Sequence, residues 1–120
     1  MSRILAIEDS PTLLGLLAKC LQGGGHEVVT ATNGEEGLAQ LTRHRPEMVV
    51  TDLNMPVMNG LDFVEAARGL REGRGVPIVL LTTETAPELM ARARFVKATG
   101  WLQKPLDGPR LLGLIAEMCD

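Results

Sequence analysis

The sequence is poor in aromatic residues. Its 120 residues include two phenylalanines, one tryptophan and no tyrosine. With so few rings available, the core has to be built mainly from Leu, Val, Ile, Ala and Met side chains. The chain is still long enough for a stable domain, because folding at this size hides roughly two-thirds of the surface of the extended chain.

Long apolar runs and a strong net charge are also missing. No window approaches the ~20 apolar residues of a membrane span, and the stretch from Ser2 to Ile7 is too short for the core of a signal peptide. The formal net charge is -3, which gives no reason to expect nucleic acid or an anionic membrane surface as a partner. We therefore expect a cytoplasmic protein with no membrane insertion.

Cysteine is scarce as well. Cys20 and Cys119 are the only two, and neither belongs to a C-x-x-C pair. Both fall on apolar helical stripes, so buried thiols in a reducing cytosol are favoured over a disulfide. No cluster of His and Cys offers the ligands of a zinc site.

Short apolar runs alternate with helical patterns along the whole chain. Short, mainly apolar runs predict strands at residues 4–7, 27–31, 48–51, 78–81 and 101–103. Helical periodicity predicts helices at 12–21, 61–70 and 85–96, another between 32 and 46, and a last one after Asp107.

Local signals refine two of these helices. Thr32 to Glu35 fits a capping box, and Asp107 is expected to cap the last helix. In the first helix the apolar side chains share one face: Leu13, Leu16, Leu17, Cys20 and Leu21.

Five strand–helix units without a repeat, linker or change in composition indicate one domain spanning residues 1–120. Apolar strands separated by helices imply an α/β fold in which helices cover both faces of a parallel sheet. In such sheets the ligand site lies beyond the carboxyl ends of the strands. Polar residues follow four of the five strands at that edge: Glu8, Asp9, Asp52, Thr82 and Lys104.

Three carboxylates gathered in one place need counter-charge. Two of them ~4 Å apart repel by about 4 kcal/mol at an effective dielectric constant near 20. Lys104 supplies one positive charge, and an all-oxygen site suits Mg²⁺. A metal beside an Asp, with Lys and Thr donors opposite, is typical of a site where a carboxylate attacks a phosphoryl group. A lone Asp at a strand end is usually a turn residue, so the joint pattern is what indicates a site.

These residues resemble a known family. Glu8-Asp9, Asp52-Leu53-Asn54-Met55-Pro56 with Gly60, Thr82, and Lys104-Pro105 look like the receiver domains of two-component response regulators. Thirty residues separate Asp52 from Thr82 and twenty-two separate Thr82 from Lys104, as in the chemotaxis regulators of the CheY type. The resemblance covers the whole chain. It implies a flavodoxin-like (βα)5 three-layer sandwich with strand order 2-1-3-4-5.

The resemblance also implies a role for each residue. Asp52 would accept phosphate from a histidine kinase, and Thr82 and Lys104 would bind the phosphoryl oxygens. Mg²⁺ would be held by oxygen ligands beside the acceptor: Asp9, Asp52, the backbone carbonyl of Asn54 and, through water, Glu8. The protein would then be a signalling switch that catalyses only its own phosphorylation and dephosphorylation.

Finer detail favours the chemotaxis branch. Asn54-Met55-Pro56, Glu84 and Thr99-Gly100-Trp101 are similar to CheY proteins, as is the lack of an output domain. This predicts a monomer that takes phosphate from a CheA-like kinase and binds a flagellar motor switch protein or a phosphatase. A phosphate sink or phosphorelay carrier is an alternative. So is a haloacid-dehalogenase-type hydrolase, although that class needs a second Asp where this chain has Asn54.

Three positions bear on signalling. Trp101 stands where the family has its switch aromatic, and the resemblance implies a ring that is exposed when inactive and buried when active. A ring half-buried in both states is the alternative. Lys97 stands where the family usually has Gly after the fourth helix, and it has a positive φ if that conformation is kept. Leu106 replaces the usual Phe.

Overall fold

The computed structural model describes residues 2–84 and 86–119. Its strands are β1 (Arg3–Ile7), β2 (Glu27–Ala31), β3 (Met48–Asp52), β4 (Ile78–Thr82) and β5 (Gly100–Gln103). Its helices are α1 (Pro11–Gly23), α2 (Gly34–His44), α3 (Gly60–Arg68), α4 (Pro87–Phe95) and α5 (Gly108–Met118), with a short 3-10 helix η1 (Arg71–Gly73) after α3. The predicted strand boundaries are correct to within one residue. The predicted start of the fourth helix at Thr85 lies outside the described residues.

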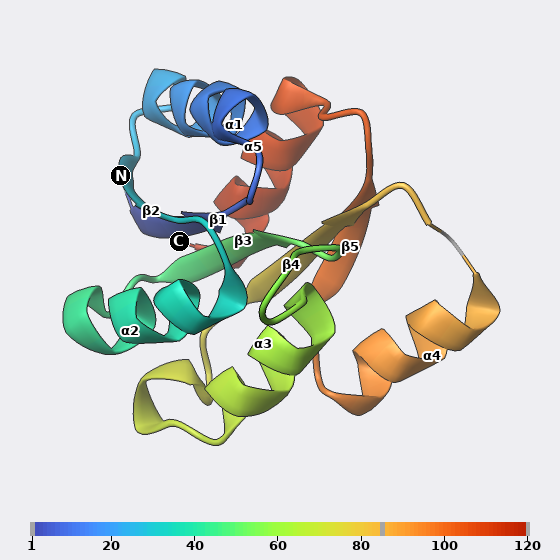
Figure 1. Ribbon diagram of the computed structural model, residues 1–120. Coiled ribbons are helices and arrows are strands. Elements are labelled where there is room, and N and C mark those ends of the chain that lie inside the picture. The colour runs from blue at the N-terminus through green and yellow to red at the C-terminus, as the bar shows by residue number, and fades with distance from the viewer. Residues whose placement is uncertain (1, 85, 120) are drawn as a thin grey trace.

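The five strands form one sheet in the order β2-β1-β3-β4-β5, and every neighbouring pair is parallel (Figure 1). This confirms the predicted flavodoxin-like topology. Helices α1 and α5 cover one face, while α2, α3 and α4 cover the other (Figure 1). None of the helices within the described residues is both long and apolar enough to cross a bilayer.

The two faces of the sheet carry separate cores, because successive side chains of a strand point to opposite faces. In β1, Leu5 and Ile7 join the core under α2, α3 and α4, whereas Ile4 and Ala6 join the core under α1 and α5. Strands β3 and β4 alternate in the same way. The central strands are therefore buried on both faces, and their carboxyl ends emerge together at one edge.

Helix starts are fixed by short polar side chains. The predicted cap at Asp107 is confirmed, since its Oδ1 accepts the Arg110 N–H at 3.1 Å. The predicted capping box is off by one residue. Asn33 caps α2 by accepting the Glu36 N–H at 2.8 Å, and Glu36 accepts the Thr32 N–H at 2.9 Å. The amide of Asn33 supplies the capping oxygen, so the helix starts one residue later than the prediction.

The apolar face of α1 is only partly buried. Leu17 and Leu21 pack in the core, but Leu13 is 44% and Leu16 56% exposed. These two side chains face the segment after β5 across a gap instead of resting on the sheet. The thiols of Cys20 and Cys119 are half-buried at the margin of the core, which corrects the expectation of full burial, and desolvation raises the pKa of Cys20.

Candidate functional site

The ends of β1, β3 and β5 bring the predicted acids and the lysine together. One carboxylate oxygen from each of Glu8, Asp9 and Asp52 lies within 4.8 Å of the others. Glu8 and Asp52 are buried and Asp9 is exposed. The strands that carry these residues are neighbours in the sheet, which explains how positions far apart in the sequence meet at one edge.

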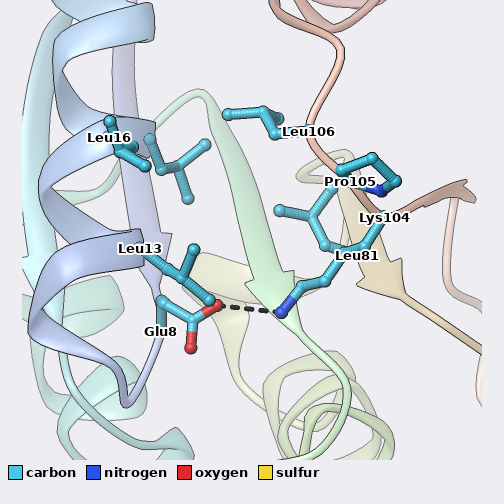
Figure 2. Close-up of a pocket in the computed structure, with 8 residues that line it drawn as sticks. Glu8, Leu13, Leu16, Leu81, Lys104, Pro105 and Leu106 are labelled. Atoms are coloured by element: carbon cyan, nitrogen blue, oxygen red, sulfur yellow. Dashed lines mark hydrogen bonds and ion pairs between the residues drawn. The ribbon is translucent and has the colours of Figure 1, made fainter.

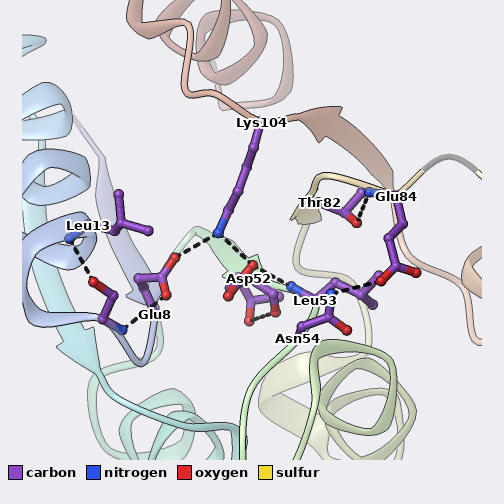
Figure 3. A network of polar contacts seen from close by, with 10 residues as sticks. Glu8, Leu13, Asp52, Leu53, Asn54, Thr82, Glu84 and Lys104 are labelled. Atoms are coloured by element: carbon purple, nitrogen blue, oxygen red, sulfur yellow. Dashed lines mark hydrogen bonds and ion pairs between the residues drawn. The ribbon is translucent and has the colours of Figure 1, made fainter.

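Lys104 lies between two of the acids. Its ammonium is 3.1 Å from Glu8 Oε1 and 2.9 Å from Asp52 Oδ1 (Figure 3). Burial disfavours the charged ammonium, but the hydrogen bonds to Asp52 and Glu8 outweigh that effect and raise the pKa of Lys104. The lysine therefore stays protonated and supplies the counter-charge that the sequence predicts.

One lysine leaves the cluster with excess negative charge. Desolvation, together with a hydrogen bond to Glu8, raises the pKa of Asp9, so this carboxylate gives up its proton less readily than a free one. The donor atoms of the three acids are all hard oxygens, the type that Mg²⁺ prefers. The cluster therefore fits a magnesium ion in charge and in ligand chemistry.

The loop after β3 holds Asp52 in place. Asp52 Oδ1 accepts the Leu53 N–H at 3.0 Å, and the Gly60 N–H donates to the Leu53 carbonyl at 2.8 Å. A Cβ added at Gly60 would lie 2.5 Å from the backbone oxygen of Asp52, so only glycine fits there. The Asn54 side chain donates to Glu84 Oε1 at 3.2 Å and ties this loop to the one after β4 (Figure 3).

Thr82 ends β4 on the other side of Asp52 from Glu8 (Figure 3). It is buried, and its Oγ1 accepts the Glu84 N–H at 2.9 Å. Because a hydroxyl both accepts and donates, its proton remains available for a ligand oxygen. The backbone of Thr82 accepts the Lys104 N–H at 2.8 Å, so the ends of β4 and β5 are fixed to each other.

The strand register relates Thr82 to Trp101. Leu80 pairs with Trp101 and Thr82 with Gln103, and side chains two residues apart share a sheet face. Thr82 and Trp101 therefore lie diagonally on the face that α3 and α4 cover. The Trp101 ring is half-buried against that core, and neither fully exposed nor fully buried.

An apolar groove adjoins the acids and was not predicted. It has a volume of about 380 Å³ and ends at Glu8 and Lys104 (Figure 2). Apolar side chains from α1, β4 and the segment after β5 line it: Leu13, Leu16, Leu17, Leu81, Pro105 and Leu106. Helical periodicity places the α1 leucines on one face, but the position of the segment after β5 is what makes part of that face a wall of the groove.

Two non-glycine residues near functional segments have a positive φ, in the left-handed region. Lys97 has φ 71°, as expected if the family's glycine conformation is kept, and Val57, in the loop after Asp52, has φ 72°. The Arg68 guanidinium supports the Lys97 turn by donating to its carbonyl at 2.9 and 3.0 Å. Nothing in the sequence pattern identifies Val57 or Arg68.

Comparison with known proteins agrees with this geometry. Residues 4–116 match the model of the response regulator receiver domain. The chain is 32% identical over 115 residues to protein PilH of Pseudomonas aeruginosa, covering 96% of this chain and 95% of PilH. It is 40% identical over 113 residues to the DNA-binding response regulator MtrA of Mycolicibacterium smegmatis, of which it spans 48%.

A solved structure of the chemotaxis protein CheY4 of Vibrio cholerae superposes with a TM-score of 0.94, at 40% identity and 98% coverage of both chains. The chain belongs to the response regulator receiver domain family. Receiver domains are signalling modules that bind Mg²⁺ in an acidic pocket and interact with histidine kinases and downstream targets.

Proposed function

We propose that this chain is switched on by phosphorylation of Asp52. The observation that carries the proposal is the placement of Asp52: buried at the end of β3, in contact with the Lys104 ammonium, and grouped with two further carboxylates. A carboxylate in contact with a cation that can also bind phosphoryl oxygens is a suitable nucleophile for phosphorus. If Asp52 and Lys104 formed only a structural ion pair, two further carboxylates beside them would weaken it by repelling Asp52. Their presence therefore favours a binding site.

In this proposal the phosphodonor is a phosphohistidine of a histidine kinase. A carboxylate oxygen of Asp52 forms a bond to phosphorus while the bond from phosphorus to the imidazole nitrogen breaks. Lys104 and the Thr82 hydroxyl then contact the phosphoryl oxygens, with the Lys104 ammonium leaving its present contacts to Glu8 and Asp52. The two donors come from neighbouring strand ends, which are fixed to each other by the hydrogen bond from the Lys104 N–H to the Thr82 carbonyl.

Four ligands would hold Mg²⁺ beside the acceptor: Asp9, Asp52, the backbone carbonyl of Asn54 and, through water, Glu8. When bound, the ion neutralises negative charge on the carboxylates and on the incoming phosphoryl group. The apolar groove offers the kinase a surface that ends at Lys104, the residue in contact with Asp52.

The output we propose is protein binding in chemotaxis or motility control, with a CheA-like kinase upstream and a flagellar motor switch protein or a phosphatase downstream. Similarity to the chemotaxis protein CheY4 over 98% of both chains supports this assignment. The signal would pass from Thr82 to Trp101, which share a sheet face. A phosphate sink or phosphorelay carrier uses the same site without a motor target.

A pull-down with the phosphorylated protein tests the output. Motor switch proteins and histidine kinases of its own cell are offered to the Mg²⁺-loaded protein with and without phosphodonor. We expect a motor switch protein to be retained only with phosphodonor, and not by Asp52→Asn. Transfer from the kinase without any such retention would favour the sink or relay role. Turnover of a phosphomonoester by the unmodified protein would instead favour the hydrolase.

A further inference from the structure

Helix α4 is weakly anchored to the rest of the molecule. It has one buried residue, Ala93, whereas α3, of the same length, has five. The end of α4 carries two arginines, Arg92 and Arg94, that are both exposed. Because α4 buries so little apolar surface, the contacts of these arginine side chains matter more for its position on the sheet than such contacts do for α3.

The two arginines have different partners. Arg92 forms an ion pair with Asp62 of α3 at 3.6 Å. Arg94 has no carboxylate within ion-pair distance among residues 2–84 and 86–119, and its guanidinium lies over the Trp101 ring, 5.8 Å from the centroid. Tryptophan is the best aromatic acceptor for a cation at this range. The interaction partner of the Arg94 guanidinium is therefore the indole ring of Trp101, in a cation–π contact.

The indole thus lies between two groups. It packs against the core beside β4, the strand that ends at Thr82, and the Arg94 guanidinium lies over its ring. A movement of the ring towards Thr82 changes its position relative to Arg94, and we expect it to weaken this contact. Because α4 carries Arg94 and β5 carries Trp101, the same contact joins the helix to the edge strand.

We propose that Arg94 is a positioning residue that holds Trp101 in its half-buried place and so favours the unphosphorylated state. The proposal rests on the proposed function, in which Trp101 moves when Asp52 is phosphorylated. By thermodynamic linkage, removing an interaction made only in the resting state increases the affinity for whatever binds the active state. An exposed cation–π contact limits the gain to about two- to fivefold.

Calorimetric titration with beryllium fluoride and Mg²⁺, a mimic of the phosphoryl group, tests this. Arg94→Gln removes the guanidinium and its charge but keeps an unbranched polar side chain, and we expect it to bind the mimic about two- to fivefold more tightly than the unaltered protein. Arg94→Lys keeps a cation over the ring and should bind close to the original affinity. Arg92→Gln is the matched control. It removes the same charge from the same end of α4 but leaves the contact with Trp101 in place, so it should leave the affinity unchanged.

A second pair of variants isolates the indole. In a Trp101→Leu background, Arg94→Gln should no longer change the affinity. An unchanged affinity in Arg94→Gln alone, or an equal gain with and without Trp101, overturns the proposal. If the unaltered protein does not bind the mimic, the proposed function fails. The contact between Arg94 and Trp101 is then tested by the fluorescence emission of Trp101 in the ligand-free protein. Arg94→Gln must change this emission and Arg92→Gln must not.

Discussion

The ammonium of Lys104 lies 2.9 Å from Oδ1 of Asp52, so a cation from the end of β5 sits against the proposed phosphoacceptor at the end of β3. The same nitrogen reaches Glu8 at 3.1 Å. Within residues 2–84 and 86–119, Lys104 is the cation in contact with these two carboxylates, so the stability of the metal-free acidic edge depends on it.

Replacing Lys104 with Met should therefore destabilise the metal-free protein. The change leaves two buried carboxylates without their cation, and we expect the free energy of unfolding to fall by roughly 1–3 kcal/mol in urea titrations. Saturating Mg²⁺ should recover part of the loss, because the ion replaces the missing charge. The exposed Lys19 of α1 serves as a control, and Lys19→Met should change stability little. Equal stability of the two variants would contradict the role of Lys104.

Mg²⁺ should stabilise the fold by mass action. At ~100 times its dissociation constant, a ligand adds about 2.7 kcal/mol to the free energy of unfolding. Asp9→Asn removes one of three repelling acids, so it should raise the stability of the metal-free protein and abolish the response to Mg²⁺. Glu117→Gln, a neutralisation on α5, should keep the full response. A normal Mg²⁺ response in Asp9→Asn would count against Asp9 as a ligand.

Lys97→Gly should stabilise the protein. At φ 71° a side chain costs roughly 1 kcal/mol relative to glycine. In a domain of this size, that gain corresponds to a rise of about 4 °C in Tm. Lys97→Ala separates backbone strain from charge, because alanine loses the ammonium but keeps a Cβ. If Ala stabilises as much as Gly, the ammonium and not the backbone is responsible.

The sequence predicts the strands and the residues of the site better than it predicts how helices α1 and α4 contact neighbouring segments. Runs such as Ile78 to Leu81 are apolar without interruption, and the edge at which Asp52 and Lys104 meet follows from parallel strand order alone. The exposure of Leu16 depends on where the segment after β5 lies, and the contact of Arg94 with Trp101 depends on how α4 sits on the sheet. Neither relationship is encoded in a local pattern.

Thr82 should couple the phosphoryl group to Trp101. The ring is the only indole in the chain, so its fluorescence reports the switch without ambiguity. We expect a change in intensity on adding Mg²⁺ and a second change on adding phosphodonor. Thr82→Ala should still be phosphorylated but should lose the second change, since the donor that moves towards the phosphoryl oxygens is gone. A phosphorylated Thr82→Ala that retains the full second change would exclude this coupling.

The most direct test of the whole account is Mg²⁺-dependent labelling of Asp52 by acetyl phosphate, read as one added phosphoryl group on the intact protein and located by peptide mass spectrometry. Asp52 is buried, contacts Lys104 and is grouped with two other acids that repel an incoming phosphoryl group, so we expect it to be labelled only when Mg²⁺ is present. Asp52→Asn, which preserves the shape of the side chain but not its charge, should remain unlabelled. Equal labelling of Asp52→Asn, or labelling at another residue, would contradict the assignment of Asp52 as the phosphoacceptor.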